Sequence, residues 1–260
     1  MGLIAYDVED GIGFVRLDRP DARNAMNKDM GLALLEVATT IANDDSLRAV
    51  LITGNGPVFS VGGDIRAFSD GAADLPDTLT RMALLSHEAI RILSRVEVPI
   101  VTAVHGACAG AALGLLYAAD ITLAAAGTKF ATGFGRIGIT ADSGNTWYLP
   151  KFIGIRRAAE MLFEDRVIDA DTAADWGLIN RVVPADELAV EAEAVVRRLA
   201  AGATRSYGEM RRLLHNSWTT TVDQALSEET AALRRISRTA DAPAAIDSFL
   251  AKRQPSFTGE

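Results

Sequence analysis

Two glycine-rich runs have the residue types that stabilise negative charge on an oxygen atom. The first covers residues 57–66 (PVFSVGGDIR), and the second covers residues 106–114 (GACAGAALG). Each run can direct a backbone N–H group toward one shared oxygen, and small residues suffice for this task. Two preorganised amide donors stabilise the oxyanion that forms when a thioester carbonyl becomes an enolate. The two runs therefore predict an oxyanion hole built from backbone groups.

The segments around these runs alternate between strand and helix patterns. Asp10-Gly11 separates two apolar runs, and this dipeptide favours the tight turn of a hairpin. Expected strands cover residues 3–8, 12–17, 48–53, 98–104 and 121–125, and helical periodicity covers 30–41, 79–93 and 110–119. Strand–helix repeats predict crossover connections and a largely parallel sheet, hence an α/β fold. From about residue 169 the pattern is nearly all helical, with candidates at 187–200, 206–214, 222–236 and 242–251.

The composition narrows the class of protein. The 260 residues are 49% hydrophobic and show no linker or repeat, which predicts one compact unit. A net charge of −8 without clustered cations argues against nucleic-acid binding. The single cysteine excludes internal disulfides, and the N-terminus begins directly with a strand pattern rather than a signal segment. Apolar runs are too short to span a membrane. We therefore expect a cytoplasmic protein with no membrane partner.

Four motifs in order along the chain resemble the crotonase superfamily, the enoyl-CoA hydratase/isomerase family. Any one of them is a weak signal, but four at the family's spacing are specific. They are RPxxxNAM at 19–26, FSxGGD at 59–64, PxxxxxxGxxxG at 99–110 with Asp120 after it, and FxxKRxPxF at 249–257.

The resemblance implies the crotonase fold, a spiral of repeated ββα units with a C-terminal helical trimerisation region. On this basis we expect a core domain at residues 1–200 and a helical capping and oligomerisation segment at 201–260. It also implies a homotrimer or homohexamer and an acyl-CoA substrate. Coenzyme A would enter as part of the substrate, with no separate cofactor and no metal.

By position, the resemblance makes the amides of Gly63 and Ala111 the donors of the oxyanion hole. Residue 111 begins an expected helix, where free N–H groups favour an anion. Lys252 matches a cation that reaches the nucleotide from the C-terminal tail, possibly that of a neighbouring subunit. The residues that the resemblance places around the substrate or coenzyme A are Ala25, Val61, Gly63, Asp64, Ile65, Arg66, Gly110, Phe134 and Lys252.

The resemblance also shows which chemistry is missing. Typical hydratases of the family use two glutamates to hold and activate water, and the matching positions here are Gly114 and Phe134. Neither residue transfers a proton, so hydration by two glutamates is not expected. Asp142 remains, at a position where some enoyl-CoA isomerases of the family have an aspartate that moves a proton. At the same position, the 4-chlorobenzoyl-CoA dehalogenase branch has an aspartate that attacks an aromatic ring.

Asp142 and His87 each have a second interpretation. The residues after Asp142 would also suit a helix that it caps, since a short acidic side chain accepts backbone N–H bonds there. His87 matches a histidine of the dehalogenase branch, but a packing residue on the helix at 79–93 is the favoured interpretation.

These observations leave three functions open. The leading hypothesis is isomerisation of an enoyl-CoA, with Asp142 as the proton carrier. The alternatives are an aryl-CoA dehalogenase or hydrolase, with Asp142 as nucleophile and His87 activating water, and an acyl-CoA-binding protein without activity. Cys108 is expected to be a buried, inert thiol.

Overall fold

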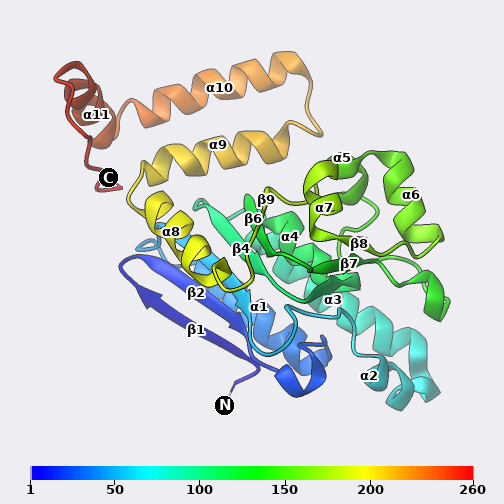
Figure 1. Ribbon diagram of the computed structural model, residues 1–260. Helices are drawn as coiled ribbons and strands as arrows, with labels where there is room; N and C mark the ends of the chain where they lie inside the picture. Colours follow the sequence, from blue (N-terminus) through cyan, green and yellow to red (C-terminus); the bar gives the residue numbers. More distant parts are fainter. Residues whose placement is uncertain (1, 260) are drawn as a thin grey trace.

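The computed structural model describes residues 2–259, and its centre is a six-stranded sheet (Figure 1). The sheet order is β1 (Ile4–Glu9), β2 (Ile12–Leu17), β3 (Ala49–Gly54), β4 (Ile100–Val104), β6 (Ile121–Ala125) and β9 (Arg181–Val183). Strands β1 and β2 form the predicted antiparallel hairpin, and the other neighbouring pairs are parallel. Asp10 and Gly11 both have the positive φ angles that such a turn requires.

Strand β9 lies in a region where we expected nearly all helix and no strand was predicted. Its three residues pair with β6, and a strand this short has no periodicity to detect. A second sheet was also not expected. It contains β5 (Ala107–Ala109), β7 (Lys129–Ala131) and β8 (Ile168–Asp169). Strand β5 leads directly into the short 3-10 helix η3 (Gly110–Ala112) and then α4 (Leu113–Ala118), so this sheet positions the second glycine-rich run.

Both faces of the six-stranded sheet are covered by apolar packing. Because side chains alternate along a strand, Val50 and Ile52 of β3 face a core that also holds helix α1 (Lys28–Ala42) and helix α3 (Leu75–Leu93). Leu51 faces the other side, where helix α8 (Leu188–Ala200) packs. Helix α3 begins four residues before the expected residue 79, with Pro76 in its first turn, where proline is well tolerated.

Of the remaining helices, those between β7 and β9 lie near the second sheet, and those after α8 form a C-terminal arm (Figure 1). The short elements are η1 (Pro20–Ala22), α2 (Ile65–Asp70), η2 (Ala72–Asp74), η4 (Gly135–Ile137), α5 (Leu149–Ile153), α6 (Ile155–Phe163) and α7 (Ala170–Trp176). The arm consists of α9 (Thr204–Asn216), α10 (Val222–Ile236) and α11 (Asp241–Leu250), and it extends away from the sheets (Figure 1). In residues 2–259, no helix combines the length and apolar character needed to cross a membrane.

Candidate active site

The two glycine-rich runs lie side by side. Ser60 and Cys108 form an isolated parallel bridge, with backbone bonds from Ala109 to Ser60 and from Ser60 to Ala107. Gly62 has φ +83°, and a Cβ there would be 2.5 Å from the Ala109 carbonyl oxygen and 3.1 Å from the Ala111 nitrogen. Only glycine permits this close approach.

The backbone N–H groups of Gly63 and Ala111 are the free donors at this contact. Within residues 2–259, neither N–H donates a hydrogen bond to another group of the chain. Both residues line the same two cavities. Two unpaired donors on one cavity wall are the arrangement that stabilises an oxyanion.

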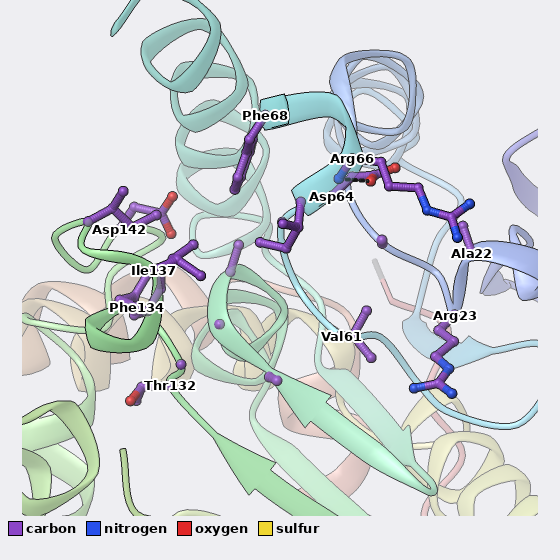
Figure 2. A pocket seen from close by; sticks show the side chains of 18 of the residues that line it. Ala22, Arg23, Val61, Asp64, Arg66, Phe68, Thr132, Phe134, Ile137 and Asp142 are labelled. Atoms are coloured by element: carbon purple, nitrogen blue, oxygen red, sulfur yellow. Dashed lines mark hydrogen bonds between the residues drawn. The ribbon is translucent and has the colours of Figure 1, made fainter. Parts of the chain in front are cut away.

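The larger cavity has a volume of about 520 Å³ and opens along this contact (Figure 2). Arg23 and Arg66 lie on one side of it in Figure 2, and Asp142, Ile137 and Phe134 lie on the other. The cavity therefore has a cationic end and a carboxylate end. Of the residues that the sequence placed around the substrate, those that line it are Ala25, Val61, Gly63, Asp64, Ile65, Arg66, Gly110 and Phe134.

A smaller recess of about 190 Å³ continues from the carboxylate end. Side chains of α3 form one wall of it, among them Leu79, Met82 and Ala83. The cavity and the recess share Gly63, Phe68, Ala111, Ile139 and Asp142. A group bound at the two free N–H donors would therefore sit where the two spaces meet.

Asp142 lies at this junction, half-buried, at the start of a turn. Its Oδ1 atom is shielded from solvent and has no hydrogen-bond partner within the described part of the chain. Burial raises the pKa of the Asp142 carboxyl above its ordinary value, although Ser143 and His87 partly oppose this effect. Residues 143–148 form turns and α5 begins only at Leu149, so the interpretation of Asp142 as a helix N-cap is wrong.

His87 holds the turn rather than facing the cavities. Its Nε2 atom accepts a hydrogen bond from the backbone N–H of Ser143, at 2.9 Å. His87 lines neither the cavity nor the recess, but a separate surface pocket between α3, the 143–148 turn and α9. Ser143 has φ +50°, an uncommon conformation for serine, and the bond to His87 stabilises it.

Asp64 stabilises the first glycine-rich run. Its carboxylate accepts from the N–H groups of Arg66 and Ala67, which makes it the N-cap of α2, and it forms an ion pair with Arg19 at 2.6 Å. Burial alone would raise the pKa of Asp64, but the bonds from Arg19 and Ala67 outweigh it and lower the pKa. Asp64 is therefore ionised, and both of its carboxylate oxygens accept hydrogen bonds within the chain.

The two positions that hold glutamates in typical hydratases are both apolar here. Phe134 is buried against the larger cavity. Gly114 is fully packed, since a Cβ built on it would be 2.2 Å from the Cδ1 atom of Ile90. Cys108 is buried within the core, and burial raises the pKa of its thiol, as expected for an inert cysteine.

Lys252 is not part of this site in its own chain. It follows α11, which Figure 1 places at the opposite end of the molecule from α2, the helix that contains Arg66. Sequence reasoning missed Arg23, Phe68 and Ile139, all of which line the cavity. Arg23 belongs to the RPxxxNAM motif, which was the one signal available for it.

Comparison with known proteins decides the family. The model of the enoyl-CoA hydratase/isomerase family matches residues 7–260. The chain belongs to this family. The resemblance to the crotonase superfamily and the expected crotonase fold are thereby confirmed, and acyl-CoA thioesters are the family's substrates.

Relatives within the enoyl-CoA hydratase/isomerase family differ in their reactions. The chain is 33% identical to 1,2-epoxyphenylacetyl-CoA isomerase of Escherichia coli over 100% of both sequences. It is 31% identical to 4-chlorobenzoyl coenzyme A dehalogenase-2 of an Arthrobacter species, over 87% of this chain and 82% of the relative. A solved structure described as an enoyl-CoA hydratase/isomerase from Mycobacterium abscessus superposes with a TM-score of 0.92 at 37% identity, covering 99% of this chain and 100% of that one.

Proposed function

We propose that the protein isomerises the double bond of an enoyl-CoA thioester. The thioester carbonyl oxygen accepts from the Gly63 and Ala111 N–H groups. The Asp142 carboxylate removes a proton from the carbon next to the thioester, and the electron pair of that C–H bond moves into a dienolate. The protonated Asp142 then returns the proton to the far end of the dienolate, which shifts the double bond and regenerates the carboxylate.

The observation that carries this proposal is the position of Asp142. It is the one carboxylate in residues 2–259 that lines both the cavity and the recess. Its raised pKa and its unpaired Oδ1 atom suit a group that takes up and releases a proton. Since Gly114 and Phe134 carry no carboxylate, a single acid–base group is what this site offers.

The cavity suggests how the substrate would lie. Arg23 and Arg66 would hold the phosphates of coenzyme A, the carbonyl would bind at the junction, and the acyl group would enter the recess. Lys252 would reach a cavity only in another subunit.

The second candidate is an aspartyl-nucleophile dehalogenase, which the 31% identity to the Arthrobacter enzyme favours. In that reaction His87 would activate water. The geometry favours isomerisation instead, because His87 lines neither space around Asp142 and its Nε2 atom is already an acceptor for Ser143.

We also propose that α9–α11 mediate assembly into a trimer or hexamer. Large apolar side chains lie exposed along these helices, and such surfaces mark protein interfaces. They are Met210, Leu214, Val222, Leu226, Leu233, Ile246, Phe249 and Leu250. Light scattering tests this proposal, and a mass near 27.6 kDa in solution would exclude it.

The reaction is tested by incubating the protein in deuterated water with 2-enoyl-, 3-enoyl-, arylacetyl- and 4-halobenzoyl-CoA. Deuterium uptake with a moved double bond supports isomerisation. Halide release would favour the dehalogenase reading, addition of water would favour hydration, and absence of any turnover would favour a binding protein.

A further inference from the structure

One buried side chain connects the two halves of the proposed machinery. Asn145 is fully buried, and its Nδ2 atom donates to the Gly110 carbonyl at 3.1 Å and to the Asp142 carbonyl at 2.9 Å. Gly110 directly precedes Ala111, the proposed oxyanion donor. The amide of Asn145 therefore lies between the segment that carries the donor and the turn that carries the proton-transfer carboxylate.

The surroundings fix the orientation of this amide. Two carbonyl oxygens face Nδ2, so the donor end must point toward them. The Oδ1 atom accepts from the Tyr117 hydroxyl at 2.9 Å. Tyr117 is itself 1% exposed and stacks on Tyr148 with ring centroids 5.4 Å apart. A fully satisfied buried polar network of this kind has one low-energy arrangement.

The turn does not need this side chain in order to form. The backbone N–H of Asn145 also donates to the Asp142 carbonyl at 2.9 Å, which closes the turn locally. What the side chain adds is the bond to Gly110, across 35 residues of sequence. Its contribution is the connection between two segments rather than the folding of one.

We propose that Asn145 is a positioning residue that sets the separation between the Asp142 carboxylate and the oxyanion donor at Ala111. This inference rests on the proposed function. To move a proton between two carbons of one substrate, the base must keep a fixed position relative to the bound thioester carbonyl. Misplacement of the base by about 1 Å lowers the rate by up to about 100-fold.

The test compares Asn145→Ala with Tyr117→Phe, using the enoyl-CoA that the wild type isomerises. Tyr117→Phe removes the hydroxyl but keeps both bonds from Nδ2, so it is the matched control for general loss of rigidity. We expect Asn145→Ala to lower kcat by about 10- to 100-fold with a change in KM below about threefold. In deuterated water, the ratio of substrate proton exchange to isomerisation should rise, because a displaced base loses its proton to solvent. In Tyr117→Phe this ratio should stay at the wild-type value.

A lower kcat with an unchanged exchange ratio, or the same change in both variants, would mean that Asn145 is merely structural and would overturn the inference. If circular dichroism shows that Asn145→Ala does not fold, Asn145→Asp is the second variant. It keeps the shape of the side chain but places an acceptor against the Gly110 carbonyl, and the ratio of proton exchange to isomerisation is measured in the same way. Asp142→Asn separates this inference from the proposed function. Full isomerase activity in Asp142→Asn would exclude the proposed function. If Asp142→Asn is inactive but Asn145→Ala has wild-type activity and a wild-type exchange ratio, only the positioning role of Asn145 is excluded.

Discussion

Ile90 occupies the space that a side chain on Gly114 would need. A Cβ at Gly114 would lie 2.2 Å from the Cδ1 atom of Ile90 and 2.8 Å from the Ser143 carbonyl oxygen. Real Cβ atoms are not found at such distances, so this position excludes a glutamate sterically as well as in sequence. The packing at Gly114 also touches the turn that carries Asp142.

Gly114→Glu should therefore not create a hydratase. We expect loss of isomerase activity and a lower free energy of unfolding, by about 1–3 kcal/mol or more, because the core is overpacked. Gly114→Ala should show the same direction with a smaller effect, although alanine is the better helix former. Urea denaturation and crotonyl-CoA hydration assays measure both effects, and a stable Gly114→Glu that hydrates crotonyl-CoA would refute this explanation.

Substitution of the cationic end should weaken substrate binding without affecting chemistry. Arg23→Ala and Arg66→Ala each remove an exposed cation worth about 1 kcal/mol against a phosphate, so KM should rise about fivefold with kcat nearly unchanged. An N-acetylcysteamine thioester lacks the nucleotide phosphates and is the control substrate. Equal effects on both thioesters would show that these arginines do not contact phosphate.

Asp120 and Arg211 connect the C-terminal arm to the sheet. Arg211 of α9 is 4% exposed and pairs with Asp120 at 2.8 Å, and the same carboxylate accepts from the Ile100 N–H. Asp120→Ala leaves a buried cation unpaired, so we expect a loss of about 3–5 kcal/mol in the free energy of unfolding. Calorimetry measures this loss in the free energy of unfolding. A wild-type melting temperature in Asp120→Ala would contradict this role.

The same pair predicts a dependence of stability on pH. Burial alone would raise the pKa of Asp120, but the contact with His215, whose Nε2 atom lies 3.9 Å from Oδ1, and the charge of Arg211 outweigh it and lower the pKa. A carboxylate whose pKa is lower in the folded than in the unfolded protein stabilises the fold at pH values above its unfolded-state pKa of about 4. This contribution is lost as the pH falls through the folded-state pKa. Asp120→Asn should accordingly lose less stability than the wild type between neutral and acidic pH.

The pH dependence of activity should report Asp142. The base must be ionised to accept a proton, and burial raises the pKa of its carboxyl. The kcat/KM profile should therefore fall on the acidic side, with its midpoint above the ordinary aspartate value of about 4. A profile that is flat down to pH 4 would exclude a buried carboxylate as the base.

Much of the fold could be predicted from the sequence because turn residues and helical periodicity determine local structure without tertiary contacts. The turn at Asp10-Gly11 and the helical periodicity behind α1 need no tertiary information. The three-residue strands β5, β7 and β9 exist only through their partners, and no pattern within three residues reveals them. The division into residues 1–200 and 201–260 stays a prediction.

The site residues that lie in sequence motifs could be predicted. The contacts between segments distant in sequence could not. Gly63 and Ala111 follow from glycine-rich runs, and Asp142 from its position in the family pattern. The wrong N-cap interpretation of Asp142 assumed a helix where the chain instead makes successive turns. The bond from Asn145 to Gly110 spans distant segments and has no local signature.

The decisive variant for the isomerase mechanism is Asp142→Asn. The amide is isosteric but cannot accept the proton, so isomerisation should fall by at least about 100-fold while binding of the substrate persists. Because burial raises the folded-state pKa of Asp142, the ionised carboxylate destabilises the fold above that pKa, and the variant should melt at a higher temperature at neutral pH. An inactive, more stable Asp142→Asn is the predicted result. Full isomerase activity in the same variant would contradict the account.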